Sequence, residues 1–242
     1  MTRKQTVIYG VLSYLAFMLS FLYLILFTGE LWVPVSAGSG VSEDFWGDAK
    51  FNFFLITLFG LQHSIMARPS FKKWWTKLVS EELERSHYVL ISTVFICIIL
   101  FFWRPMGAVL WHFENEFIVT CLWSIFVFGW VLTVFSTFLT NHFDLFGLRQ
   151  VYLHYVEESY TNVVFSEHLV YKIIRHPMML GMLIGFWVTP MMTLGHAVLA
   201  AGFSVYILIG IYFEEKSLLN TLGNDYRAYR LSTPKLIPRL RP

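Results

Sequence analysis

The sequence has little charge and few cysteines, and each shortage excludes a class of protein. Charged residues make up only 14% of the 242 residues, against about 25% in a soluble domain. A net charge of +2 excludes the broad basic face of a nucleic-acid-binding protein. Cys97 and Cys121 both lie in apolar runs. Their spacing indicates no disulfide framework and no metal site, so we expect two small core residues.

Apolar residues dominate instead, at 56% of the chain, with 19% aromatic. Residues 7–27 form an apolar run long enough to cross about 30 Å of hydrocarbon. Arg3 and Lys4 resemble the basic start of a signal peptide, but the run exceeds the usual length of about 7 to 15 residues and has no small-residue cleavage site. We therefore expect this run to remain as a first membrane span.

Five more apolar runs follow, at residues 51–67, 88–103, 117–139, 178–192 and 196–213. The fifth of the six runs is short and contains Gly181, Gly185 and Pro190, and only residues 193–195 separate it from the sixth. These two runs are expected to form a tight helical hairpin, countable as one broken span or as two. The sequence thus predicts an all-α, polytopic transmembrane helix bundle of five to six spans.

The basic residues give the expected topology. If the N-terminus is cytoplasmic, then 16 of the 18 Lys and Arg residues fall in cytoplasmic segments, namely the N-terminus, residues 68–87, residues 140–176 and the tail from 214. Only Lys50 and Arg104 fall on the other side. Cytoplasmic loops carry such an excess. We expect both termini to be cytoplasmic in a multi-pass membrane protein, most simply of a bacterial inner membrane.

The chain reads as one membrane domain, residues 1–242, without internal repeats or long linkers. Its polar residues gather in the C-terminal part, so residues 1–139 are expected to be N-terminal spans. Residues 140–242 are expected to be the cofactor-binding portion, with the hairpin, a small cytoplasmic part and the tail. A site for a water-soluble cofactor belongs there.

The sequence Arg175-His176-Pro177 stands directly before the fifth run, with Gly181 one turn inside it. Proline suits the first turn of a helix, so His176 is expected at a helix N-terminus, where unpaired N–H groups and the helix dipole attract anions. Arg175 adds a second partner for an anion. Gly181 allows a ligand or a neighbouring backbone to approach closely.

Two adjacent carboxylates, Glu214 and Glu215, follow the sixth run, and a helix continues from them toward Gly223. Carboxylates near a helix C-terminus are disfavoured, so a partner such as an ammonium or a ribose hydroxyl is expected. Pro234 and Pro238 then mark an extended end that can fold back as a lid.

The order R-H-P-x-x-x-G, an apolar hairpin, E-E-x-x-L, G-x-x-Y-x-x-Y and P-x-x-x-P resembles the isoprenylcysteine carboxyl methyltransferases. Within that superfamily, the chain is most similar to bacterial methanethiol S-methyltransferases, through N-H-F-D-L-F-G-L-R-Q at 141–150 and H-S-I-M-A-R-P at 63–69. The resemblance extends over nearly the whole chain. It implies that S-adenosylmethionine, held beside the hairpin, methylates a small thiol, most simply methanethiol to dimethyl sulfide.

The resemblance also implies a set of cofactor-binding residues: Phe165, Tyr171, Arg175, His176, Pro177, Met178, Gly181 and Glu214. Two positions depart from the superfamily pattern. Met179 stands where a tyrosine is usual, and Gly210 stands where the isoprenylcysteine enzymes carry an arginine one turn before the first glutamate. Without that arginine, a prenylcysteine carboxylate has no evident partner, which favours a smaller, uncharged acceptor.

Thiol methylation needs a thiolate, because the thiolate is the nucleophile. His142 and Asp144 are the predicted catalytic bases, since a carboxylate two residues on could orient or charge-pair the imidazole. Asn141 and Arg149 are predicted to fix their geometry and to bind substrate. His63, late in an apolar run, is a further predicted substrate-binding residue.

These residues also have structural interpretations. Arg175 and His176 could anchor the helix at the membrane interface, and Glu214 and Glu215 could be a solvated helix end. His142 and Asp144 could belong to a turn or a helix cap, and His63 could be a neutral, hydrogen-bonded core histidine.

Four other functions stay open, and one of them is that of an isoprenylcysteine-type carboxyl methyltransferase. His63 and His196 could be axial ligands of a haem, in a redox protein. The chain could also be a membrane enzyme that uses a nicotinamide cofactor, although it has no Gly-rich phosphate loop, or an accessory protein without activity. No protein partner is evident from the sequence. The bilayer and a small thiol are the expected partners.

Overall fold

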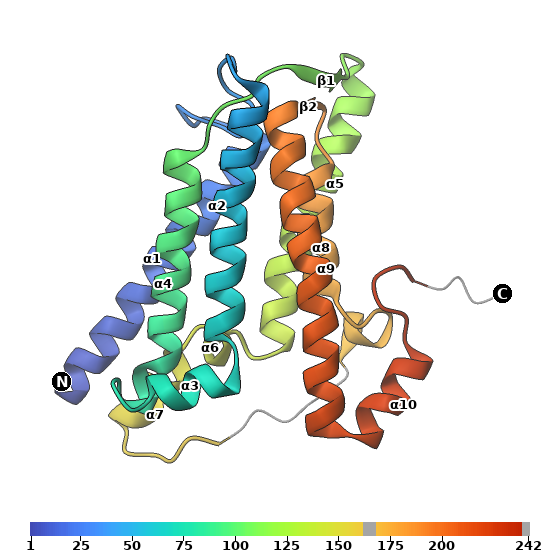
Figure 1. Cartoon of the computed structure of the whole chain (residues 1–242). Helices are drawn as coiled ribbons and strands as arrows, with labels where there is room; N and C mark the ends of the chain where they lie inside the picture. Colours follow the sequence, from blue (N-terminus) through green and yellow to red (C-terminus); the bar gives the residue numbers. More distant parts are fainter. Residues whose placement is uncertain (162–167, 239–242) are drawn as a thin grey trace.

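The structure is a computed structural model that describes residues 1–161 and 168–238. It is almost entirely helical (Figure 1). In chain order the elements are α1 (Arg3–Gly29), α2 (Phe45–Met66), α3 (Pro69–Trp75), α4 (Glu81–Phe102), β1 (Val109–His112), α5 (Glu116–Leu139), α6 (His142–Leu145), α7 (Leu148–Tyr155), the 3-10 helix η1 (Leu169–Lys172), α8 (Pro177–Trp187), β2 (Met191–Thr193), α9 (Leu194–Leu222) and α10 (Asn224–Ser232).

The long helices form the bundle expected of a multi-pass membrane protein. Within the described residues, 4 helices are long and apolar enough to cross a membrane: α1, α4, α5 and α9. Helix α2 is more polar but runs alongside α4 and α9 through the same bundle (Figure 1). Helix α8 has only 11 residues, which is about 17 Å of helix and too short to span a bilayer alone. The predicted polytopic helix bundle is confirmed.

Side-chain caps mark where several of these helices begin. Thr2 and Gln5 form a capping box at the start of α1, and Asn115 accepts backbone N–H bonds from the first turn of α5. Thr193 caps α9 in the same way, through the backbone N–H of His196. These caps satisfy N–H groups that have no partner within their own helix.

The segments rich in Lys and Arg all lie at one end of the bundle. The N-terminus, α3, α6, α7 and α10 lie at the lower end in Figure 1, and the β1–β2 ribbon lies at the upper end. The chain therefore brings together the four basic segments that the charge pattern predicts to share one side of the membrane.

The predicted hairpin of two packed helices is different in the structure. Helix α8 packs most extensively against α5 and less against α9. After Trp187 the chain becomes extended, and β2 pairs antiparallel with β1, with Met192 opposite Trp111. The turn is thus bound to the segment that precedes α5. Pro190 lies in this extended stretch. Because proline cannot donate a backbone hydrogen bond, it disfavours a continuation of α8 there.

Glycines explain the close packing of α8 on α5. A Cβ on Gly181 would lie 2.5 Å from the carbonyl oxygen of Gly129, and a Cβ on Gly185 would lie 2.5 Å from the ring of Trp130. Real side chains do not fit at such distances. Of the two uses predicted for Gly181, the structure supports the close approach of a neighbouring backbone, so we leave Gly181 out of the proposed cofactor site.

We expect Gly181→Ala to lower the free energy of unfolding by about 1 to 3 kcal/mol, because the new methyl group pushes α8 off the α5 backbone. Thermal unfolding of the purified protein in detergent measures this effect. Gly210→Ala is the matched control, since no atom lies within 4 Å of a Cβ built there. Equal stabilities of the two variants would contradict this account of the α5–α8 contact.

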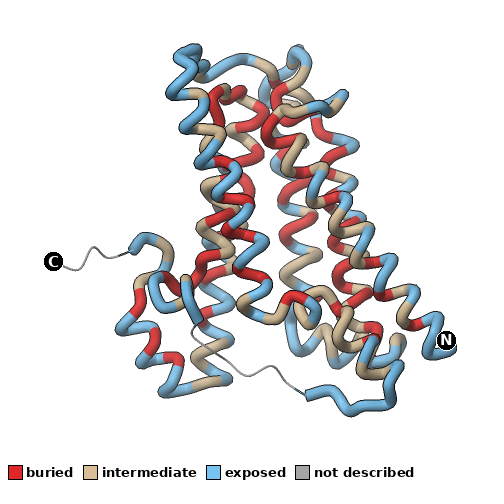
Figure 2. Tube along the Cα trace, turned by 180° about the vertical axis from the view of Figure 1, so that it is seen from behind, coloured by how far each residue is buried: buried red, intermediate tan, exposed pale blue. Residues whose placement is uncertain are grey.

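Apolar side chains cover the outside of the bundle as well as its core. Helix α1 alone exposes Ile8, Leu12, Leu15, Leu19 and Leu22, and exposed stretches run along the outer faces of the helices in Figure 2. Cys97 and Cys121 are also exposed. Our expectation that they are core residues is wrong, because an apolar position in a membrane protein faces either the core or the lipid.

Candidate active site

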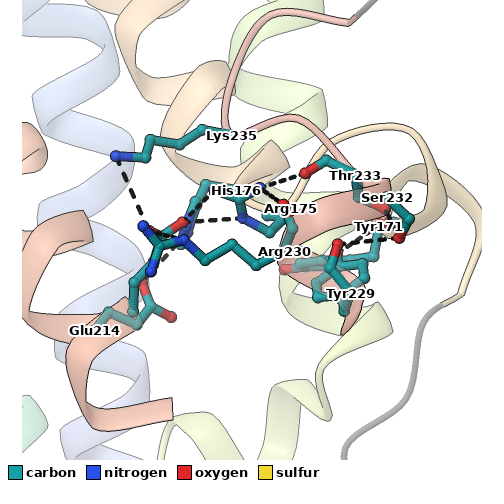
Figure 3. A network of polar contacts seen from close by, with 10 residues as sticks. Tyr171, Arg175, His176, Glu214, Tyr229, Arg230, Ser232, Thr233 and Lys235 are labelled. Atoms are coloured by element: carbon teal, nitrogen blue, oxygen red, sulfur yellow. Dashed lines mark hydrogen bonds and ion pairs between the residues drawn. The ribbon is translucent and has the colours of Figure 1, made fainter. Parts of the chain in front are cut away.

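A buried carboxylate, Glu215 of α9, is the centre of a polar network at the basic end of the bundle. Its partners Arg175, His176, Arg230 and Lys235 are labelled in Figure 3. Arg175 donates from Nε and Nη2 to Glu215 Oε1, at 2.9 and 2.6 Å. Its Nη1 donates to the carbonyl oxygens of Arg230 and Thr233. The side chains of Arg230 and Lys235 approach the other carboxylate oxygen at 3.8 and 3.9 Å.

This network fastens the C-terminal tail onto the start of α8. The backbone N–H of Arg175 donates to the Pro234 carbonyl at 2.9 Å, and that of His176 donates to the Lys235 carbonyl at 3.2 Å. Tyr229 adds a bond from its hydroxyl to the Tyr171 carbonyl at 2.6 Å (Figure 3). The predicted return of the tail is confirmed.

The contacts of these charges are at odds with one prediction and with one alternative interpretation. All three guanidinium nitrogens of Arg175 have partners within the chain, so Arg175 is not an anion partner for a cofactor; its side chain is only 6% exposed. Glu215 is not part of a solvated helix end, since its side chain is only 7% exposed. A buried charge persists only when it is paired, and the tail supplies the remaining partners.

His176 precedes α8, and Pro177 occupies the first turn, as predicted. The imidazole lies between the two glutamates, with Nε2 3.2 Å from Glu215 Oε1 and Nδ1 3.5 Å from Glu214 Oε2. The side chain of Glu214 is 47% exposed. Thus the buried glutamate holds the tail, and the other one faces outward.

Glu214 faces a polar cleft of about 740 Å³ at the same end of the bundle. Tyr171 and Met178, two more of the predicted cofactor residues, also line it. Burial and the Glu214 carboxylate raise the pKa of Tyr171 to about 12, so its hydroxyl keeps its proton at neutral pH. The cleft is acidic, because six carboxylates line it: Glu81, Glu82, Glu84, Asp144, Glu158 and Glu214.

A second cavity, of about 270 Å³, lies inside the bundle and is lined mainly by apolar side chains from α1, α2, α4, α5, α8 and α9. His63, His142 and Gly210 lie on its wall, together with Met179. The two positions that depart from the superfamily pattern therefore both face this apolar cavity.

The two cavities adjoin one another. Arg85, Leu145 and Met178 line both of them. A ligand in the polar cleft and a ligand in the apolar cavity would meet at these three side chains.

The ring of His142 is buried in the wall of the apolar cavity, and both of its nitrogens have partners. Nδ1 lies 2.7 Å from Thr137 Oγ1, and Nε2 lies 2.8 Å from the Tyr14 hydroxyl. Thr137 donates its own proton to the Val134 carbonyl, so Nδ1 carries the imidazole proton and Nε2 accepts from Tyr14. Burial holds the pKa of His142 below its usual range. The ring is therefore neutral at pH 7.

Asp144 is not paired with His142, contrary to our prediction. Its Oδ1 accepts from Arg149 at 3.0 Å, and its Oδ2 accepts from the Tyr160 hydroxyl at 3.3 Å. Asp144 lines the polar cleft, whereas His142 lines the apolar cavity. The short helix α6 turns these two side chains to different sides.

Asn141 and Arg149 fix this local geometry, as predicted, but neither lines the apolar cavity as a substrate-binding residue would. Asn141 adopts a left-handed conformation and caps α6 by accepting from the backbone N–H of Asp144. Arg149 also donates to the carbonyl and hydroxyl oxygens of Thr161. Phe165, a predicted cofactor residue, lies outside the described residues.

His63 is held by a bond between its Nδ1 and the Ser92 hydroxyl, at 3.2 Å. Its ring lies 6.1 Å from that of Tyr206 in α9. His196 lies ten residues before Tyr206 in the same helix, a rise of about 15 Å. It bonds the Phe186 carbonyl there. His63 and His196 cannot hold one haem between them, which removes the haem alternative.

Sequence reasoning missed several residues of this site. The sequence pattern indicates only a basic loop residue at Arg85, and it places Tyr14 and Thr137 within apolar spans. A polar residue inside a span is costly without a partner, so Tyr14 and Thr137 did carry a usable signal. For Arg85 no local signal exists, because its position between the two cavities depends on how α4 packs against α1, α2 and α7.

The sequence is similar to those of several known proteins. The family described as NnrU protein matches residues 53–235. A methanethiol S-methyltransferase of Mycobacterium tuberculosis is 44% identical over 238 residues, covering 98% of both chains. One of Crocosphaera subtropica is 41% identical over 98% of this chain and 93% of its own length.

A more distant relative, nurim of Rattus norvegicus, is 28% identical over 68% of this chain and 65% of its own length. No solved structure matches. The chain belongs to the NnrU protein family, in which it groups with the proteins named methanethiol S-methyltransferase.

Proposed function

We propose that this protein transfers a methyl group from S-adenosylmethionine to a small thiol, methanethiol, to give dimethyl sulfide. The observation that carries this proposal is the pair of adjoining cavities, one polar and acidic, the other apolar. A charged methyl donor and an apolar acceptor each have a matching site, and the two sites meet. The names of the similar proteins support the same reaction.

The residues of the polar cleft fit the donor. S-adenosylmethionine supplies an electrophilic methyl group on a sulfonium, and it also carries an ammonium group. Six carboxylates on the cleft wall favour such cations. Tyr171 can donate a hydrogen bond from its protonated hydroxyl, and Glu214 can accept from the ammonium or the ribose. His176, Pro177 and Met178 place the N-terminus of α8 beside them, where the donor's carboxylate can bind.

The apolar cavity fits the acceptor. It has neither a side chain at Gly210 nor a hydroxyl at Met179, so these two positions of its wall offer no group that binds a carboxylate. His142, neutral and on the wall, is the residue that we propose as the first acceptor of the thiol proton. To accept it, Nε2 must exchange its bond with Tyr14 for one with the thiol.

Product analysis is the direct test. Purified protein supplied with S-adenosylmethionine and methanethiol is expected to release dimethyl sulfide, measured by gas chromatography. Activity on a farnesylcysteine analogue without activity on methanethiol would place the chain in the isoprenylcysteine branch instead. Binding of NADPH but not of S-adenosylhomocysteine would favour the nicotinamide alternative.

We expect Glu214→Gln to weaken the binding of S-adenosylmethionine about tenfold, which corresponds to about 1.4 kcal/mol, because the amide keeps the shape of the side chain but removes the charge. Calorimetry on the folded variant measures the affinity. Glu157→Gln is the control, since Glu157 is exposed, pairs with Arg3 and does not line the cleft. Unchanged affinity in Glu214→Gln would remove Glu214 from the cofactor site.

We also propose that both termini are cytoplasmic, because the basic segments share one end of the bundle with the polar cleft. The donor then enters from the cytoplasm. Reporter fusions at the C-terminus are expected to be active on the cytoplasmic side of a bacterial inner membrane. A reporter active only on the outer side would overturn this topology.

A further inference from the structure

The reaction proposed above places a negative sulfur in an apolar cavity, and an anion without a partner there is costly. The wall of that cavity has titratable groups in His63, Tyr88, His142 and Tyr206, and among the residues that the structure describes Arg85 is its only Lys or Arg side chain. Arg85 is therefore the candidate countercharge for the thiolate.

The guanidinium of Arg85 has the hydrogen-bonding capacity to serve an anion. Its Nε donates to the Leu145 carbonyl at 2.6 Å, and its Cζ lies 4.8 Å from the centre of the Tyr88 ring. Over residues 1–161 and 168–238, Arg85 makes no other hydrogen bond and no ion pair. The two terminal nitrogens are thus available to a ligand.

The neighbouring acidic groups do not neutralise Arg85. On its own helix, Glu82 pairs with His154 at 3.5 Å, and Glu84 pairs with Lys72 at 3.7 Å. Asp144 of α6 is bound to Arg149 and Tyr160. Glu81, Glu158 and Glu214 line the cleft without an ion pair to Arg85, and Tyr171 lines it as a neutral phenol. An arginine beside so many carboxylates usually forms an ion pair with one of them. Because Arg85 forms none with the described residues, its guanidinium is free to bind an anionic ligand.

Arg85 also lies where the reacting atoms must meet. Within the described part of the chain only three residues line both cavities, and the other two, Leu145 and Met178, are apolar. We infer that Arg85 is a catalytic residue that binds the acceptor as a thiolate, holding its sulfur at the junction of the polar cleft and the apolar cavity. This inference deepens the proposed function and rests on it.

The proposed reaction transfers one proton and one methyl group. The acceptor's S–H bond breaks, and its proton passes by way of His142 to water, which leaves the electron pair on sulfur beside Arg85. That sulfur forms a bond to the methyl carbon as the carbon's bond to the donor sulfur breaks, with that bonding pair remaining on the donor sulfur. The product is a neutral thioether, which Arg85 does not hold, and this favours its release.

The test compares wild type, Arg85→Gln and Arg85→Lys in the full chain purified in detergent. With saturating acceptor at pH 7, we expect kcat to fall at least about tenfold in Arg85→Gln, because the bound thiol ionises less readily without the cation. The loss is expected to shrink as pH rises, and Arg85→Lys is expected to restore part of the rate. Lys77→Gln, which removes an exposed cation of the same basic segment outside both cavities, is expected to match wild type.

Acceptor acidity gives a second comparison that a merely structural role would not affect. Ethanethiol and trifluoroethanethiol have the same carbon skeleton, but electron withdrawal by fluorine makes the fluorinated thiol more acidic, so a larger fraction of it is ionised near neutral pH. We expect the loss in Arg85→Gln to be smaller with trifluoroethanethiol. Equal losses with both thiols and parallel pH profiles would overturn the inference.

A binding measurement is independent of turnover. Thiolates absorb ultraviolet light that thiols do not, so difference spectra with S-adenosylhomocysteine present report how much bound ethanethiol is ionised. We expect ionisation at lower pH in wild type than in Arg85→Gln, with similar S-adenosylhomocysteine affinity. A large loss of that affinity with an unchanged ionisation would assign Arg85 to the cofactor and overturn the inference. If wild type neither binds S-adenosylhomocysteine nor methylates a thiol, the proposed function itself fails.

Discussion

Replacing Glu215 with alanine is expected to lower the free energy of unfolding by about 3 to 5 kcal/mol, the cost of removing one partner from a buried ion pair. The Arg175 guanidinium would lose two bonds from a site that is only 6% exposed. Arg230 and Lys235 would lose their shared carboxylate, so the tail is expected to detach from the start of α8. Thermal unfolding in detergent and limited proteolysis of the tail measure these two effects.

The neighbouring position provides the control. Glu214→Ala removes a carboxylate that is 47% exposed, so its cost is expected to stay below about 1 kcal/mol. A double variant, Arg175→Met with Glu215→Leu, is expected to recover much of the lost stability, since it leaves no unpaired charge. If Glu215→Ala were no less stable than Glu214→Ala, the buried network would not hold the tail.

Filling the apolar cavity is expected to abolish thiol methylation while the cofactor still binds. No atom lies within 4 Å of a Cβ built at Gly210, which lines the cavity. A phenylalanine can therefore be placed there without a backbone clash, and its ring occupies space that the acceptor needs. We expect kcat/KM for methanethiol to fall about a hundredfold in Gly210→Phe, the size of effect that misplacement of a reactant produces.

Two measurements make this test specific. Calorimetry is expected to show near-normal affinity for S-adenosylhomocysteine, because Gly210 does not line the polar cleft. Ile209→Phe enlarges the adjacent, 50% exposed position on the outside of the same helix, and it is expected to keep wild-type activity. Full activity in Gly210→Phe would mean that the acceptor binds elsewhere.

The predictions that succeeded depend on local rules. Apolar run length gave the long helices, although α9 extends beyond its run to Leu222. Pro177 predicted the start of α8. Pro234 and Pro238 predicted the extended tail that folds back onto it. Each of these features is decided within a few residues by hydrophobic length or by backbone restriction.

The predictions that failed depend on which side chains meet. Glu214 and Glu215 are adjacent and chemically identical, yet one faces the cleft and the other is buried under the tail. Successive residues on a helix point about 100° apart, so packing decides which of them is buried. In the same way, α6 directs His142 into the apolar cavity and Asp144 into the polar cleft, although only one residue separates them.

By itself, the sequence determined that this chain is an almost entirely helical membrane protein, and it predicts that the basic segments share one side, because hydrophobic length and charge placement act without knowledge of the tertiary contacts. Only the tertiary structure decided that Arg175 forms an ion pair with Glu215 and that Arg85 lines both cavities. A guanidinium forms its bonds across elements that are distant in the chain, and Arg175 and Glu215 are 40 residues apart. Their partnership is set by how α8, α9 and the tail pack, which no local pattern of residues encodes.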